Sequence, residues 1–257
     1  MKLSVKPELL KLFAAAAGVL GLLLYMVLYT TGMDEEGLLI PGHWAGIALT
    51  VLTPLVLTAV VLLTRGIDGS DDYRAAHPAS TVRGAGCFGL AAVLGITAWK
   101  DWCSDTALDM LMGILMFAAA AGLLYVGVCR VAEAKPLFLG NAAVCACFAI
   151  RMVWQYQFWS SDPQLLDYVY LLCAYGALML IAYQQAAFDV GMGNHRGLWA
   201  LSLAAVYLCC VAFWSAVDTA LLLAGGIWAL TNMTSLKARP RRQRPALNLD
   251  REPREEV

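Results

Sequence analysis

Long apolar segments separated by short polar ones dominate the pattern of this sequence. The apolar segments run over 12–29, 44–64, 84–99, 107–129, 137–154, 165–183, 198–213 and 219–236. A helix needs about 20 mostly apolar residues to cross the hydrocarbon core of a bilayer. The pattern therefore predicts eight transmembrane helices. The third and seventh are somewhat short, so we expect tilting or local bilayer thinning there.

Composition supports this prediction and excludes a soluble globular protein. Apolar residues make up 60% of the chain, charged residues make up 14%, and the mean hydropathy is +0.66. A soluble domain is about half apolar and a quarter charged. We therefore expect an all-α, polytopic membrane helical bundle of four tandem helical hairpins over 1–236, followed by a basic, disordered cytoplasmic tail over 237–257.

The distribution of positive charge predicts the orientation of the chain. Sixteen of the 18 Lys and Arg residues lie in the N-terminal segment, in the loops after the second, fourth and sixth spans, or in the C-terminal tail. Lys100 alone lies in the opposite loops, and Arg151 lies inside a span. Because Lys and Arg favour the cytoplasmic side, we expect a plasma-membrane protein with both termini in the cytoplasm. An even number of spans likewise requires the two termini to lie on the same side of the membrane.

A short pattern of Trp, a small polar residue and Asp recurs at three of the predicted outer turns. The copies are Trp102–Asp105, Trp159–Asp162 and Trp214–Asp218, spaced by 57 and 55 residues. Tandem duplication of a helical hairpin explains this spacing. Independent origin explains it as well, because Trp favours the membrane interface and Asp favours helix starts. The copies run in the same direction, unlike the inverted repeats of many transporters.

Three stretches carry a resemblance to a group of proteins. They are the acidic outer loop Thr31–Trp44, the run Trp159–Tyr168 (WSSDPQLLDY) and Phe188–Gly193 (FDVGMG). In these stretches the chain resembles uncharacterised multi-pass membrane proteins of anaerobic Firmicutes, along most of its length. The resemblance implies a fold and a membrane location, and no activity.

Arg151 is the candidate functional residue, because a cation inside a span is costly unless it is paired or hydrated. Asp109 and Asp167 enter neighbouring spans from the outer side, and either could pair with Arg151. Aromatic residues gather at the same level; the candidate ligand-binding set among them is Trp102, Trp154, Trp159, Tyr168 and Trp214. These residues predict either an outward-facing aromatic cavity that binds a ligand, or an interfacial aromatic belt beside a structural ion pair.

The sequence carries no catalytic, cofactor or metal motif. Its three histidines are scattered over loops on both sides of the membrane, and its cysteines lack ligand spacing. The basic segment Lys237–Arg244 could bind anionic lipid, but we favour a topological stop, and nothing indicates nucleic-acid binding. We expect an integral membrane protein that binds or transports a small solute. The alternative is a non-catalytic interaction, assembly or sensory subunit with a membrane-protein partner.

The predicted orientation has a direct test. A membrane-impermeant maleimide should modify Cys103 in intact cells, because Cys103 lies in an outer loop, and should spare Cys129 at an inner span end. Mass spectrometry of the labelled peptides distinguishes the two cysteines. The reverse pattern would overturn the orientation.

Overall fold

The protein is an all-helical bundle, as the sequence predicts. A computed structural model describes residues 7–32, 40, 42–68, 80–104, 106–159, 165–214, 218–234 and 239–240. Within these ranges the α-helices are α1 (Pro7–Thr31), α2 (Trp44–Leu63), α4 (Thr81–Trp102), α5 (Ala107–Val131), α6 (Phe138–Trp159), α7 (Leu165–Val190), α8 (His195–Ala212) and α9 (Thr219–Thr234). Seven are long and apolar enough to cross a membrane, and α9, with 16 residues, is shorter. The chain is thus an integral membrane protein.

The observed helices differ from the predicted spans mainly at their inner ends. The sixth predicted span stops at residue 183, but α7 continues to Val190. Gln185 and Asp189 are therefore inside a helix, and both are buried. The apolar run ends before the helix does, because these polar side chains are enclosed by neighbouring helices rather than by lipid. The shortest of the described α-helices is α9, with 16 residues; α8, which covers the seventh predicted span, has 18, and α4, which covers the third, has 22.

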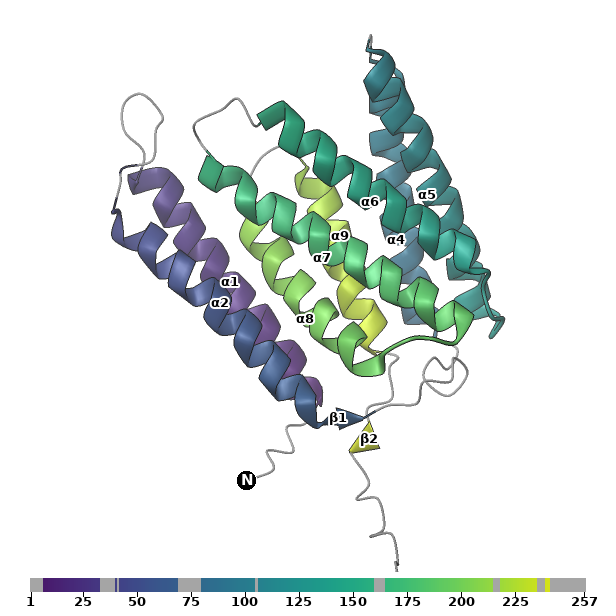
Figure 1. Ribbon diagram of the computed structural model, residues 1–257, viewed down its shortest axis with the longest axis horizontal. Helices are drawn as coiled ribbons and strands as arrows, with labels where there is room; N and C mark the ends of the chain where they lie inside the picture. The colour runs from purple at the N-terminus through teal and green to yellow at the C-terminus, as the bar shows by residue number, and fades with distance from the viewer. Residues whose placement is uncertain are drawn as a thin grey trace, which may run out of the picture.

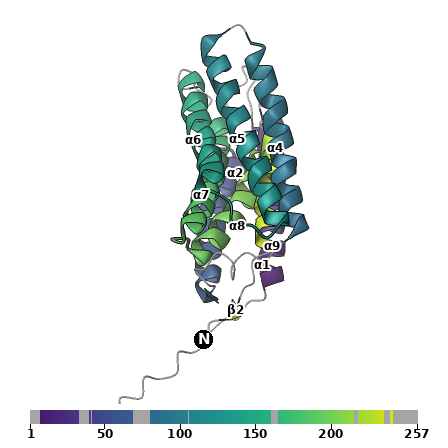
Figure 2. The ribbon, with the colours of Figure 1, turned by 90° about the vertical axis from the view of Figure 1, so that its right-hand side faces the viewer.

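Six of the helices close into a ring. Each helix from α4 to α9 packs against its neighbours in sequence, and α9 also packs against α4 (Figure 1). This six-helix ring consists of the hairpins α4–α5, α6–α7 and α8–α9. The α1–α2 hairpin lies beside the ring, where α1 packs on α8. The α4–α5 hairpin lies at the opposite edge of the bundle in Figure 1 and faces the viewer in Figure 2.

Both described ends of the chain lie at one end of the bundle. After the 3-10 turn η1 (Thr64–Gly66), strand β1 (Ile67–Asp68) pairs antiparallel with β2 (Arg239–Pro240). The N-terminal end of α1 lies near this pair (Figure 1). This placement agrees with an even number of crossings. We call this end of the bundle inner, and the end with the connections after α1, α4, α6 and α8 outer.

Glycines set the closest helix contacts. A Cβ added at Gly122 of α5 would lie 2.7 Å from the carbonyl oxygen of Gly140 on α6. A Cβ added at Gly113 of α5 would lie 2.9 Å from the carbonyl oxygen of Ala98 on α4. Lipid tails are as apolar as side chains, so helices in a membrane associate through close packing at small residues. Large apolar side chains instead cover the exposed faces of the helices.

Burial changes the design of the labelling test. Cys103 is exposed at the end of α4, as the test requires, but Cys129 is buried in α5. Cys129 would stay unmodified on either side of the membrane, so it is the wrong inner reporter. Glu133→Cys places a thiol at an exposed position in the turn that follows α5, and this variant supplies the inner reporter instead.

Two glycines of α4 give a matched test of the packing. A Cβ at Gly86 would lie 2.0 Å from Thr231 Oγ1 of α9, whereas a Cβ at Gly89 meets nothing within 4 Å. We expect Gly86→Ala to lower the free energy of unfolding by about 1–3 kcal/mol, the usual cost of overpacking. Gly89→Ala should raise it by up to about 1 kcal/mol, because alanine is the better helix former. Thermal unfolding of the purified variants in detergent measures both, and equal losses would contradict the packing.

Candidate functional site

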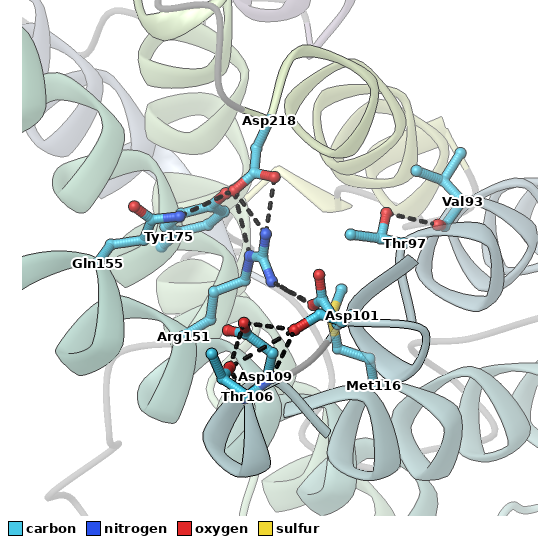
Figure 3. Close-up of polar contacts among 11 residues, drawn as sticks. Val93, Thr97, Asp101, Thr106, Asp109, Met116, Arg151, Gln155, Tyr175 and Asp218 are labelled. Carbon is cyan, nitrogen blue, oxygen red and sulfur yellow. Dashed lines mark hydrogen bonds and ion pairs between the residues drawn. The ribbon is translucent and has the colours of Figure 1, made fainter. Parts of the chain in front are cut away.

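Arg151 lies on α6 and is buried, with its side chain 8% exposed. Its Nη2 donates to both carboxylate oxygens of Asp218, at 2.7 and 2.9 Å, and its Nε donates to Oδ2 at 3.1 Å. Its Nη1 donates to Asp101 Oδ2 at 3.2 Å and lies 3.3 Å from the sulfur of Met116 (Figure 3). Such bidentate pairing is the strongest arrangement open to a guanidinium. The cation is therefore neutralised within the bundle.

Asp218 is the residue on which these contacts converge. It directly precedes α9 and is 8% exposed. Its carboxylate also accepts hydrogen bonds from the hydroxyl of Tyr175 on α7 and, at 3.3 Å, from Nε2 of Gln155 on α6. A buried carboxylate needs several donors, because it has lost its hydration. Asp218 obtains them from α6 and α7.

The resulting outer network consists of Asp101, Arg151, Gln155, Tyr175 and Asp218. Asp101 comes from the end of α4, the next three come from α6 and α7, and Asp218 comes from the connection between α8 and α9. One guanidinium therefore links all three hairpins of the six-helix ring at its outer end (Figure 3).

The carboxylates that link to Arg151 differ from those that the sequence indicated. Asp109 Oδ2 accepts from Thr106 and, at 2.7 Å, from Ser104, while its own backbone N–H donates to Thr106 Oγ1 at 3.3 Å. Thr106 is thus the cap of α5, and the Asp109 carboxylate holds the Thr106 hydroxyl in place. Among the described contacts of Arg151, none is to Asp109. Asp167 belongs to α7, but its side chain lies outside the described residues.

Sequence reasoning missed Asp101 and Asp218 because it placed both in outer loops. Each lies at or next to a copy of the recurring pattern: Asp101 directly precedes Trp102, and Asp218 ends the third copy. That position at a helix end was the available signal. It shows which carboxylates lie near the outer end, but pairing with α6 depends on how the hairpins pack.

The predicted aromatic residues mostly face outward. Trp102 and Trp214 are exposed, whereas Trp154 and Tyr168 are partly buried. Trp159 ends α6, and its side chain lies outside the described residues. Exposed tryptophans at helix ends are typical of an interfacial belt. The aromatic residue that joins the outer network is instead Tyr175, which is fully buried.

A second polar cluster, the inner network, lies at the opposite end of the ring. Arg130 Nη2 of α5 donates to Asp189 Oδ1 of α7 at 3.5 Å, and Asn141 Nδ2 of α6 donates to Asp189 Oδ2 at 2.6 Å. Arg83 Nε of α4 donates to Asn232 Oδ1 of α9 at 3.1 Å. All five side chains are buried. The two arginines had been counted as loop charges that set orientation, so the sequence did not indicate this cluster.

The two networks are separated by an apolar layer. Tyr175 and Asp189 are 14 residues apart on α7, which corresponds to about 21 Å along a helix. Phe148 and Leu178, both fully buried, belong to the core between these levels. Five elements contribute to both levels: α4 through Arg83 and Asp101, α5 through Arg130 and Met116, α6 through Asn141 and Arg151, α7 through Asp189 and Tyr175, and α9 with its preceding residue through Asn232 and Asp218.

The ion pair predicts a characteristic pattern of stabilities. Arg151→Met leaves the Asp218 carboxylate buried without its cation and should lower the free energy of unfolding by about 3–5 kcal/mol. The double variant Arg151→Met/Asp218→Asn should recover much of this loss, because the carboxylate that still lacks its cation, Asp101, is partly exposed, whereas Asp218 is buried.

Asp109→Asn is the matched control for these variants, because Asp109 lies at the same end without touching Arg151. We expect it to cost at most about 1 kcal/mol, because the Thr106 cap that it supports stays in place. Thermal unfolding in detergent ranks the four proteins. A double variant less stable than Arg151→Met would contradict the pairing.

Neither a metal site nor a relative helps to identify the site. Among the described residues, no group of three or more His, Cys, Asp and Glu side chains is placed to hold a metal ion. No protein-family model, curated protein or solved structure matches the chain. The function must therefore be inferred from the two buried networks themselves.

Proposed function

We propose that this membrane protein binds a small charged solute and transports it through the interior of the six-helix ring. In this proposal the outer network is the closed outer end of the pathway. The observation that carries the proposal is the position of Arg151, whose single guanidinium bridges carboxylates from two other hairpins.

The energetic cost of the networks supports a role beyond packing. A buried ion pair is on average no more stabilising than apolar side chains of the same volume, because both ions lose their hydration. Ionisable groups within membrane spans are correspondingly rare, and they mark solute or ion pathways by default. The presence of two such networks in one small bundle favours a function in which these contacts separate and reform.

The contacts of Arg151 are unequal, and this indicates how the outer end would open. Asp218 makes three of its hydrogen bonds and is 7% exposed in its side chain, whereas Asp101 makes one and is 24% exposed. A partly hydrated carboxylate with one hydrogen bond separates at the lower cost. Opening would therefore begin between Asp101 and Arg151, with the α4–α5 hairpin moving away from α6.

The alternative is a non-catalytic interaction, assembly or sensory subunit, and one observation favours it. Each guanidinium nitrogen of Arg151 already has a hydrogen-bond partner, as a purely structural ion pair would. In that case the outer network would stay closed throughout the protein's activity. The two functions thus differ in whether the residues beneath Arg151 ever become accessible to water.

Cys147 is a natural reporter for this difference. It lies one helical turn from Arg151 towards the inner end of α6 and is 1% exposed. We expect Asp101→Asn to increase the rate at which a water-soluble maleimide modifies Cys147 in lipid nanodiscs by roughly tenfold. The substitution weakens the contact between residue 101 and Arg151, which is already the weaker of the two contacts that close the outer end. Peptide mass spectrometry follows Cys147 and the exposed Cys103 in the same sample.

Asp109→Asn is the control for this experiment, since it alters a carboxylate at the same end without altering a contact of Arg151. It should leave the labelling rate of Cys147 at the wild-type value. If folded Asp101→Asn protein labels at Cys103 and never at Cys147, the outer network does not open, and the structural alternative is favoured.

A further inference from the structure

The inner network holds two guanidinium groups close to one another. Arg83 and Arg130 are 0% and 4% exposed, and Asp189 is the carboxylate that the described residues place beside them. Arg130 pairs with Asp189 at 3.5 Å, and Arg83 is close enough for its charge to act on the same carboxylate. A guanidinium donates hydrogen bonds and accepts none. A group with negative charge and several acceptor atoms is the kind of ligand that such donors bind.

Gln185 supplies an independent sign of a ligand. Its side chain is fully buried, and neither its amide oxygen nor its amide nitrogen has a hydrogen-bond partner among the described residues. Gln185 and Asp189 are four residues apart on α7, so they share one face of the helix and lie one turn apart. Gln185 therefore points into the bundle beside the inner network.

Ser202 of α8 is a second buried polar side chain of this kind, on a different helix. It is also fully buried, and its hydroxyl has no partner within the described part of the chain. Ser202 shares a helix face with Cys209, whose Cβ would lie 3.4 Å from a Cβ added at Gly226 of α9. Because α8 and α9 are antiparallel, the direction from Cys209 to Ser202 along α8 is the direction from Gly226 to Asn232 along α9. Ser202 is therefore displaced from Cys209 towards the level of Asn232 in the inner network.

We propose that the inner network, together with the buried amide of Gln185 and hydroxyl of Ser202, binds a small oxyanion, a carboxylate or a phosphate. Arg83 and Arg130 supply the charge, and Gln185 and Ser202 supply donors that lack partners otherwise. Burying a polar group without a partner costs about as much as a hydrogen bond is worth, so the ligand would remove a cost that the empty protein carries.

The surroundings of the inner network suit an anion that arrives from water. Lys135 and Arg196 are exposed at the inner end, against Glu133 in the same turn as Lys135. Charges at the entrance of a site raise the local concentration of ions of opposite sign. This proposal rests on the proposed function, because it identifies the transported solute as an anion.

Gln185→Met offers the sharpest test, because methionine keeps the length of the side chain and removes both polar atoms. Thermal unfolding is measured in phosphatidylcholine nanodiscs over a range of inorganic phosphate or succinate concentrations, with the ionic strength held constant by potassium chloride. Wild-type protein should be stabilised as either oxyanion is added. Gln185→Met should need roughly tenfold more oxyanion for the same stabilisation, since one hydrogen bond to a charged group is worth about 1.4 kcal/mol or more.

Gln184→Met is the matched control. Gln184 is the adjacent amide, and its Oε1 accepts from the backbone N–H of Asn194 at 3.4 Å, away from the inner network. It should keep the wild-type dependence on oxyanion concentration. Ser202→Ala is the second test variant and should weaken the dependence as Gln185→Met does. In the absence of oxyanion, Gln185→Met should be at least as stable as wild type, which separates loss of binding from loss of folding.

The outcomes distinguish a free anion from a lipid headgroup. Stabilisation by phosphatidylglycerol nanodiscs alone, lost in Gln185→Met, would assign the same site to a headgroup phosphate. No stabilisation of wild-type protein by phosphate, succinate or phosphatidylglycerol would overturn the proposal, and so would equal stabilisation of wild type and Gln185→Met. Oxyanion binding without Cys147 labelling would keep this site and reject transport, whereas Cys147 labelling without oxyanion binding would keep transport and reject the anion.

Discussion

The burial of one guanidinium, that of Arg151, constrains the outer half of the molecule. A cation at this depth persists only if anions reach it, so Asp218 and Asp101 must both lie within reach of α6, one from each of the other two hairpins of the ring. Their positions in turn fix the end of α4 and the start of α9 relative to α6, and Tyr175 brings α7 into the same contact. The three hairpins of the ring are therefore held in register by electrostatics at a level where apolar packing alone would permit sliding.

The rest of the ring shows how little apolar burial contributes to specificity inside a membrane. Side chains gain little by leaving lipid for the protein interior, so the contacts that position the helices are close backbone approaches and polar networks. Glycines provide the first, as between Gly122 and Gly140. The outer and inner networks provide the second, and an apolar layer separates them. Among the described residues, two carboxylates meet one guanidinium in the outer network, whereas two guanidinium groups and one carboxylate belong to the inner network.

This arrangement has a functional consequence. A solute that entered from either end would first meet charged groups already engaged with one another, so binding would require an exchange of partners rather than occupation of an open cavity. Such exchange couples binding to movement of the hairpins, because the partners belong to different hairpins. The outer network is saturated by its own residues, whereas Gln185 and Ser202 at the inner end retain polar atoms without partners among the described residues. The inner end is therefore the better placed of the two to hold a ligand.

The sequence by itself determined the class of the protein and the number of its helices, since the length and apolarity of a span are local requirements of the bilayer. It also identified Arg151, because a charge inside an apolar run is visible without knowledge of the fold. Only the structure decided what Arg151 contacts, that Asp109 supports the Thr106 cap of α5 instead, and that Arg83 and Arg130 are buried rather than in loops. Those facts depend on which helix faces which, and in lipid that choice is made by small residues and polar contacts between segments far apart in the chain.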